Sequence, residues 1–268
     1  MSLAQFLKSK LQMPSKSIKK AIERGAFTLN GCVERFASMK LNSKDKIEFT
    51  LNGLEDSLKA QKSVFDSASI LYQDDYLLVY NKPSFMSSEE LFSQVQWFPV
   101  HRLDKETSGV LLFAKNKKVQ ILLEDLFRKR LVKKTYVAIC SGIVEKNAGV
   151  ITNPLQIVLT SQGKKISKCV KSASESTKSA ITEWECKKRG ENITLLYCYP
   201  KSGRMHQIRS HLSCVLYPIV GDYLYGYKGV LVPRLFLHAL ELTFEHPILL
   251  KNLTITAELP EGFLKLFM

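Results

Sequence analysis

The chain has 268 residues, with 39 Lys and Arg against 25 Asp and Glu, which gives a formal net charge of +14 at pH 7. Hydrophobic residues make up 45% of the sequence, so the chain can bury a core, and this excludes a wholly disordered protein. The length predicts one large domain, alone or with a smaller one. The basic residues cluster along the sequence, which favours a polyanionic partner over a charge that serves only solubility.

The sequence also indicates where the protein works. No apolar stretch approaches the ~20 residues that a transmembrane helix requires, and residues 1–13 lack the continuous apolar core of a signal peptide. No two cysteines form a Cys-x-x-Cys pair; they are Cys32, Cys140, Cys169, Cys186, Cys198 and Cys214. We therefore expect reduced thiols, a cytoplasmic location, no membrane association and no metal bound by the cysteines.

Residues 1–50 read as a small separate unit with ten Lys or Arg and only four Asp or Glu. Ser15 is placed to cap a helix over residues 17–24, and Gly25 is placed to end it. The Asn-Gly pair at residues 30–31 then indicates a hairpin, and a further short strand follows. The basic side chains of the helix suit RNA phosphates: Lys16, Lys19, Lys20 and Arg24. The alternative is an ordinary solvated helix face.

The rest of the chain predicts a linker over residues 51–66 and a second domain over residues 67–268. Apolar residues at helical spacing predict a helix within residues 116–130, and a hairpin is expected about residues 189–192. The Ser/Lys-rich residues 157–180 have little pattern and are expected to form an irregular excursion. Because strands outnumber helices, we expect an α+β fold: a mainly antiparallel mixed sheet with flanking helices, plus a small N-terminal α/β module.

Familiar catalytic motifs are missing from the sequence. It contains no Walker-type Gly-rich loop, no Gly-x-Ser-x-Gly and no His-Glu-x-x-His. The spacing of the five histidines fits no metal-binding pattern, so we expect neither a metal nor an organic cofactor. His211 and His246 are interpreted as packed or hydrogen-bonded residues.

Asp104 is the candidate for chemistry. It lies in the basic segment HRLDKETSGVLLFAK, directly before an apolar run that reads as a buried strand. The simplest interpretation is a turn residue whose carboxylate caps a backbone amide of Thr107 or Ser108. The segment SGRMHQIR offers Arg209, and a buried Arg requires a carboxylate, so Asp104 and Arg209 can satisfy each other. An adjacent cation keeps a carboxylate ionised, as a covalent nucleophile requires.

Several long segments resemble the RluA-type pseudouridine synthases, in consistent order along the chain. They are YQDDYLLVYNKP, HRLDKETSGVLLFAK, KKTYVAICSG, SGRMHQIRSHL with YPIVGDYLYG, and PRLFLHALELTFEHP. This resemblance runs from about residue 67 to the end and implies the pseudouridine synthase fold. Within residues 1–50, PSKSIKKAIERGAFTLNG and DKI resemble the S-four module, which binds RNA in some ribosomal proteins and RNA-modifying enzymes.

The resemblance implies roles for single residues. Asp104 is the nucleophile of uridine isomerisation, Tyr136 stacks on the uracil and takes a proton, and Arg209 pairs with Asp104. Arg102 fills the gap left by the flipped nucleotide, and flipping is required because a stacked uridine does not expose its reacting atoms. Substrate contacts or supports are expected at His101, Lys82, Arg204, His206 and Gln207.

We therefore expect an enzyme that converts specific uridines to pseudouridine in structured RNA, preferably ribosomal RNA of the large subunit. Transfer RNA is the alternative substrate, and no obligate protein partner is evident. A second alternative is a non-catalytic RNA-binding or ribosome-assembly factor on the same fold, which need not keep Asp104, Tyr136 and Arg209 together. A third is a hydrolase that uses Asp104 with His101 or His206 and releases bases or breaks strands.

Overall fold

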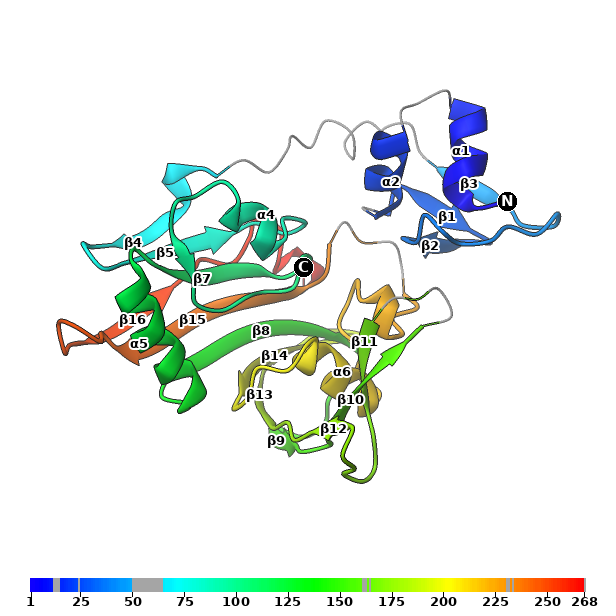
Figure 1. Cartoon of the computed structure of the whole chain (residues 1–268). Coiled ribbons are helices and arrows are strands. Elements are labelled where there is room, and N and C mark those ends of the chain that lie inside the picture. Colours follow the sequence, from blue (N-terminus) through cyan, green and yellow to red (C-terminus); the bar gives the residue numbers. More distant parts are fainter. Residues whose placement is uncertain are drawn as a thin grey trace.

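The computed structural model describes residues 1–11, 15–23, 25–49, 65–160, 163, 165–229, 232 and 234–267. Figure 1 shows two parts: an N-terminal unit, drawn in blue, and a large unit built around an extended sheet. We call residues 1–49 the N-terminal unit and residues 65–267 the large unit. The linker predicted at residues 51–66 lies almost wholly outside the described residues.

Two helices pack on a three-stranded antiparallel sheet in the N-terminal unit. The elements are α1 (Leu3–Leu11), α2 (Ser15–Glu23), β1 (Phe27–Leu29), β2 (Cys32–Glu34) and β3 (Ile47–Phe49), with strand order β2-β1-β3. The buried core comprises Leu3, Leu7, Ile18, Ala21, Ile22 and Phe27. Because the apolar residues of α2 share one face, its lysines remain on the outer faces of the unit.

The turn signals of this unit are where the sequence predicts them. Gly25 lies shortly after α2, with φ of 78°, and its amide donates to the carbonyl of Ile22 at 2.8 Å. Asn30 and Gly31, with φ of 53° and 79°, make the tight turn between β1 and β2. The predicted cap is wrong, since Ser15 already belongs to the first turn of α2.

The large unit contains, within its described residues, a ten-stranded sheet in the order β4-β5-β7-β15-β8-β14-β13-β9, with β16 beside β15 and β6 beside β7. Its strands are β4 (Ile70–Gln73), β5 (Leu77–Lys82), β6 (Phe98–Pro99), β7 (Ser108–Ala114), β8 (Lys133–Ser141), β9 (Ala148–Ile151), β13 (Thr182–Arg189), β14 (Ile193–Pro200), β15 (Leu237–Glu245) and β16 (Asn252–Thr256). The pairing of β7 with β15 is parallel and the other pairings are antiparallel. The predicted α+β class with a mainly antiparallel mixed sheet is confirmed.

Helices cover this sheet because its inner strands are apolar on both faces. The helices are α4 (Ser88–Phe92), α5 (Lys117–Arg128) and α6 (Gln207–Cys214), with short 3-10 turns η1 (Ser67–Ser69), η2 (Tyr223–Tyr225) and η3 (Lys265–Phe267). Along β5, Leu77 and Val79 pack with the buried residues of α5, whereas Leu78 and Tyr80 pack with Leu91 of α4. This alternation places successive side chains in two separate cores.

Strand β15 comes late in the sequence but lies in the middle of the sheet, between β7 and β8 (Figure 1). Its Ala239 pairs with Gly109 of β7 on one side and with Tyr136 of β8 on the other. Gly109 has φ of 112°, and a Cβ there would collide with the carbonyl oxygen of Ala239. Only glycine allows this close approach of β7 to β15.

Residues 157–180 correct one expectation. They contribute to a small second sheet, order β11-β10-β12, formed by β10 (Leu155–Leu159), β11 (Lys165–Cys169) and β12 (Thr177–Lys178). The prediction of an irregular excursion is therefore wrong where these strands lie, whereas residues 170–176 lie outside the strands. The helix predicted within residues 116–130 and the hairpin about residues 189–192 are confirmed by α5 and by the β13–β14 pair.

In the part of the chain that the structure describes, no helix is both long enough and apolar enough to cross a membrane. Within the same residues, none of the groups of His, Cys, Asp or Glu is arranged to hold a metal ion.

Candidate active site

Asp104 lies in the loop between β6 and β7, with a side chain that is 21% exposed. The amide of Thr107 donates to the main-chain carbonyl of Asp104 at 3.1 Å, so the main chain itself closes this turn. The carboxylate instead meets side chains from the start of α6. Its Oδ2 lies 3.4 Å from Nη1 of Arg209, and its Oδ1 lies 3.8 Å from Nε2 of His206.

Arg209 is the buried centre of a cluster of acids. Its side chain is 4% exposed, and it donates from Nε and Nη2 to the two carboxylate oxygens of Asp222 at 2.8 and 2.9 Å. The remaining group, Nη1, lies 3.4 Å from both Asp104 and Glu106. Burial opposes the charge, but Asp222, with Asp104 and Glu106, outweighs it and raises the pKa of Arg209 well above its usual range. The guanidinium is therefore a fixed cation beside Asp104.

Tyr136 lies on β8, where it packs at the border of two hydrophobic cores. Burial, and then the negative charge of Asp104, raise the pKa of its phenol above the ordinary value. The neutral phenol is thus strongly favoured at neutral pH. This state suits a stacking surface better than a proton-accepting phenolate.

His206 precedes α6 in a left-handed conformation, with φ of 50°. Its Nδ1 shares a hydrogen bond with the hydroxyl of Tyr225 at 3.0 Å. The same hydroxyl accepts a hydrogen bond from the main-chain amide of Ser167 at 2.9 Å. Burial lowers the pKa of His206, although Asp104 opposes this shift. Tyr225 also places its ring 5.2 Å from the guanidinium carbon of Arg209. The small sheet that contains Ser167 is thereby tied to the site.

Lys82 is a support and not a surface contact. Its side chain is fully buried, and its Nζ donates to the carbonyls of Pro83, Met86 and Lys105 at 3.0, 2.7 and 3.3 Å. Burial lowers the pKa of Lys82 to about 7, against the opposing charge of Asp104. The three bonds join the loop after β5 to the loop of Asp104.

Gln207 supports the site from the start of α6. It is buried, donates to the carbonyl of Ile181 at 2.9 Å, and accepts from the hydroxyl of Ser202 at 2.7 Å. Its amide oxygen also accepts the main-chain amide of Arg204 at 3.1 Å. These bonds fix the bend that carries His206 and Arg209.

His101 has its described contacts in α5 and β7, and its role as a substrate contact stays a prediction. Its ring stacks on Phe127 of α5 with centroids 4.8 Å apart, and its Nε2 accepts the amide of Leu112 at 3.0 Å. Burial and the charge of Lys134 lower the pKa of His101 to about 3. A neutral ring held in this way packs between α5 and the sheet.

Arg102 and Arg204 are the exposed arginines near the site. The Arg102 side chain is 71% exposed and forms an ion pair with Glu89 of α4 at 3.1 Å. The Nε of Arg204 donates to the carbonyl of Ser179 at 3.2 Å. Both side chains are exposed at the surface.

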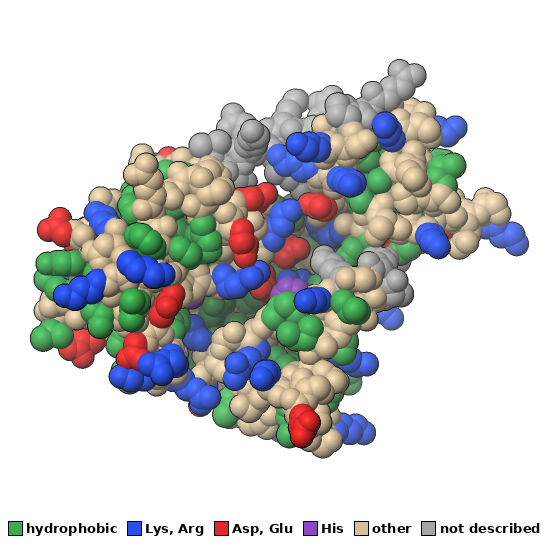
Figure 2. Space-filling view, in the orientation of Figure 1, with side chains coloured by type: hydrophobic (Ala, Val, Ile, Leu, Met, Phe, Trp, Pro, Cys, Tyr) green, Lys and Arg blue, Asp and Glu red, His purple; other side chains and the backbone are tan. Residues whose placement is uncertain are grey.

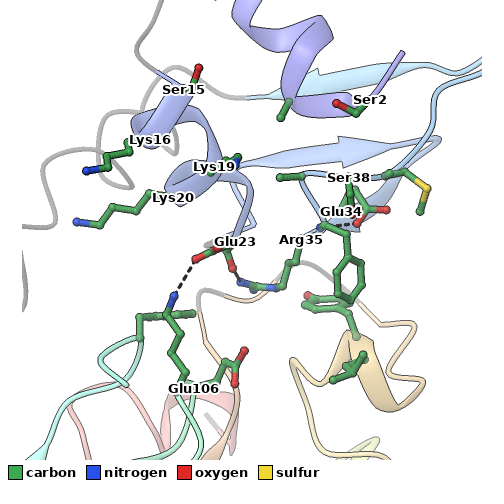
Figure 3. A pocket seen from close by; sticks show the side chains of 18 of the residues that line it. Ser2, Ser15, Lys16, Lys19, Lys20, Glu23, Glu34, Arg35, Ser38 and Glu106 are labelled. Atoms are coloured by element: carbon green, nitrogen blue, oxygen red, sulfur yellow. Dashed lines mark hydrogen bonds and ion pairs between the residues drawn. The ribbon is translucent and has the colours of Figure 1, made fainter. Parts of the chain in front are cut away.

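A cleft of about 1750 Å³ lies between the two units. Arg209 and Asp222 line it from the large unit. From the N-terminal unit, Lys16, Lys19 and Lys20 of α2 line it, as Figure 3 shows. Figure 2 shows acidic and basic side chains gathered around the hollow between the units. The structure thus brings three of the four predicted N-terminal basic residues to the cleft, while Arg24 lies outside the described residues.

Asp222, Glu106 and Tyr225 are the residues of the site that sequence reasoning missed. All three lie in the quoted segments HRLDKETSGVLLFAK and YPIVGDYLYG. A buried guanidinium has five donors, and Asp104 alone cannot satisfy them. This need for further acceptors could have predicted that more carboxylates lie around Arg209.

The fold, taken with this site, defines a class of RNA-modifying enzyme. The solved structure of human RNA pseudouridylate synthase domain containing 4 superposes with a TM-score of 0.62. The match has 27% sequence identity and covers 74% of this chain and 91% of that one. The large sheet is therefore a pseudouridine synthase fold.

The sequence comparisons name the family. The model of the RNA pseudouridylate synthase family matches residues 75–214. A ribosomal large subunit pseudouridine synthase C of Buchnera aphidicola is 36% identical, over 77% of this chain and 71% of the relative. A tRNA pseudouridine synthase C of Haemophilus ducreyi is 35% identical, over 74% of this chain and 93% of the relative. The chain belongs to the RNA pseudouridylate synthase family and is an RNA pseudouridine synthase.

Proposed function

We propose that this protein isomerises specific uridines of large-subunit ribosomal RNA to pseudouridine, with Asp104 as the nucleophile. The observation that carries the assignment is the carboxylate of Asp104, held 3.4 Å from the buried guanidinium of Arg209. Asp222 occupies the other donors of Arg209, so the guanidinium is fixed before substrate arrives. A positioned, ionised carboxylate is the form that attacks a carbon centre.

The reaction balances within the nucleotide. The bond from uracil N1 to ribose C1′ breaks, the base rotates, and C5 bonds to C1′. C5 then loses its proton and N1 gains one, so the composition of the nucleotide is unchanged. Tyr136, as a neutral phenol, stacks on the uracil, and Asp104 forms and releases the transient bond to substrate. Arg102 enters the space left by the flipped uridine, since a stacked nucleotide hides its reacting atoms.

The remaining residues divide into supports and RNA contacts. Lys82, Gln207 and His206 hold the loops around Asp104, and Arg204 meets a phosphate at the surface. The lysines of α2, with Arg24, bind phosphates as part of an RNA-binding module over residues 1–50. Residues 51–66 link this module to the catalytic domain, residues 67–268. Five cysteines of the described residues are free thiols, which supports a cytoplasmic location.

Ribosomal RNA is the proposed substrate because relatives such as the Buchnera enzyme are named for the large ribosomal subunit. The resemblance of residues 1–50 to the S-four module also supports a structured RNA. Transfer RNA is the second candidate, since the Haemophilus relative is named for it.

Asp104→Asn tests the proposal. Unmodified ribosomal and transfer RNA are incubated with wild type and variant, and pseudouridine is mapped by carbodiimide-blocked primer extension. We expect new stops in ribosomal RNA with wild type and none with Asp104→Asn. Stops only in transfer RNA would change the substrate. Binding without stops would indicate a non-catalytic factor, and abasic sites or strand breaks would indicate a hydrolase.

A further inference from the structure

Arg35 connects the N-terminal unit to the large unit. It follows β2 and lines the same cleft as Arg209. Its guanidinium carbon lies 5.2 Å from the ring centroid of Tyr223 and 5.9 Å from that of Phe85, and both rings belong to the large unit. Figure 3 shows the Arg35 side chain at the junction of the two units.

The group that surrounds Arg35 is both aromatic and acidic. We call Phe85, Tyr223, Glu106 and Asp222 the socket. Nη1 of Arg35 donates to the carbonyl of Glu23 at 2.8 Å, within its own unit. Nε and Nη2 are buried without a hydrogen-bond partner among the described residues. The large unit therefore holds the guanidinium through ring faces and nearby carboxylates, an environment that suits Arg because it is weakly hydrated and stacks on aromatic rings.

The electrostatics of Arg35 agree with this geometry. Burial lowers the pKa of its guanidinium, and Tyr223, Glu106 and Asp222 oppose that shift. The two carboxylates that face Arg35 are also the partners of Arg209. One acidic pair is therefore shared by a cation of the N-terminal unit and the cation of the active site.

A second contact between the units lies beside the active site. Nζ of Lys105 forms an ion pair with Glu23 of α2 at 2.8 Å, with side chains 39% and 51% exposed. Exposed ion pairs of this kind contribute little. Arg35, whose guanidinium Nε and Nη2 are buried, is the main attachment, and both contacts reach residues next to Asp104, Arg209 or their partners.

We propose that Arg35 is a positioning residue: seated in the socket, it fixes the N-terminal unit as one wall of the cleft that leads to Arg209. This inference rests on the proposed function, because the cleft is taken to hold RNA. A fixed unit presents the lysines of α2 to the same RNA molecule whose uridine is at Asp104, which raises their effective concentration. Arg35 therefore acts on the affinity for structured RNA and leaves the isomerisation step unchanged.

A double-mutant cycle tests the attachment. Steady-state kinetics on the ribosomal RNA substrate compare wild type, Arg35→Ala, Tyr223→Leu and the double variant. We expect each single change to raise KM about tenfold with kcat unchanged, since each removes the shorter cation–aromatic contact, between Arg35 and Tyr223. The double variant is expected to match the single variants, because both substitutions remove one shared contact. Tyr223→Phe keeps the ring and is expected to behave as wild type.

Lys46→Ala is the matched control. It removes one positive charge from the same unit, but Lys46 is 77% exposed and does not line the cleft. We expect its KM to equal that of wild type, whereas Arg35→Lys, which keeps the charge without the planar group, still raises KM. Additive effects in the cycle, a fall in kcat at constant KM, or an equal rise with Lys46→Ala would overturn the role of Arg35.

A measurement without substrate is independent of turnover. Small-angle X-ray scattering of the full chain is expected to give a larger radius of gyration for Arg35→Ala than for wild type or Lys46→Ala. An unchanged radius would overturn the proposal whatever the kinetics. If the proposed function is wrong, wild type itself forms no pseudouridine. If wild type is active but the effects of the two substitutions add in the double variant, only the role of Arg35 is refuted.

Discussion

Asp222 determines how Arg209 faces the active site. By pairing with Nε and Nη2 it fixes the plane of the guanidinium, and only Nη1 remains directed toward Asp104 and Glu106. A guanidinium without this partner would be a buried cation held by longer contacts. The alignment of the nucleophile therefore depends on a residue that does not touch it.

We expect Asp222→Ala to lower the free energy of unfolding by about 3–5 kcal/mol, because it leaves a buried cation without its main partner. Turnover is expected to fall as well, since Arg209 loses its orientation. Urea unfolding and the primer-extension assay measure the two effects. Asp125→Ala is the control, because Asp125 pairs with Lys129 at the surface of α5. A similar loss of stability in both variants would contradict the assignment to Asp222.

His101 makes stability depend on pH. Its pKa is lowered to about 3 in the folded protein, below the ordinary value of about 6.5. The unfolded chain therefore binds a proton at a pH where the folded chain does not. The stabilisation is complete above about pH 6.5 and is lost as pH falls toward 3.

The variant His101→Gln keeps an acceptor for the amide of Leu112 but does not titrate. Between pH 6.5 and 5, wild type is expected to lose about 2 kcal/mol more of its unfolding free energy than this variant. Urea unfolding at several pH values measures the difference. Parallel pH profiles would mean that His101 titrates normally in the folded state.

At the level of single residues, the sequence predicted the carboxylate of Asp104 and the guanidinium of Arg209 but not all of their partners. Asp104 and Arg209 lie far apart in the chain. The need of a buried Arg for a carboxylate made the pair possible, and the resemblance to the RluA-type pseudouridine synthases singled it out. His101 and His206 both sit beside polar segments, so sequence alone could not separate a packed ring from one at the site. Their difference arises from tertiary contacts with Phe127 and Tyr225.

Helix α5 begins at a side-chain cap. Oδ1 of Asn116 accepts the amide of Val119 at 3.0 Å, and the helix then buries Val119 and Leu123 against the sheet. We expect Asn116→Ala to lower the unfolding free energy by about 1 kcal/mol without changing turnover. Thermal unfolding checks this, with the exposed Lys118→Ala as control. A loss of activity in Asn116→Ala would show that α5 affects the site.

Elements with strong periodicity could be predicted, and those that depend on distant partners could not. The apolar spacing of α5 and the Asn-Gly turn at residues 30–31 are local signals, and both were reliable. Strands β10 and β11 are short and are paired with each other, and the Tyr225 hydroxyl accepts the amide of Ser167 from a distant part of the chain. A segment of this kind reads as irregular until its partners are known.

Across the whole molecule, the N-terminal unit contributes positive charge to the cleft. The logarithm of the binding constant falls as the logarithm of the salt concentration rises. Replacing Lys16, Lys19 and Lys20 by Ala is expected to make this slope shallower by about 2, because the loss of three phosphate contacts reduces the number of counterions released. Filter binding at several salt concentrations measures the slope. The control removes Lys10, Lys44 and Lys46, which carry equal charge outside the cleft. Equal slopes for the two triple variants would show that charge, and not position, attracts the RNA.

The central place of β15 has a consequence for the order in which the enzyme matures on the ribosome. Asp104 belongs to the half of the sheet that ends with β7, whereas Tyr136 and Arg209 belong to the half that begins with β8. Ala239 pairs with both halves and so fixes the strand register between them. A nascent chain that has not yet exposed this strand holds the acid and its cation on separate pieces, so we expect Asp104 and Arg209 to meet only after β15 has left the ribosome.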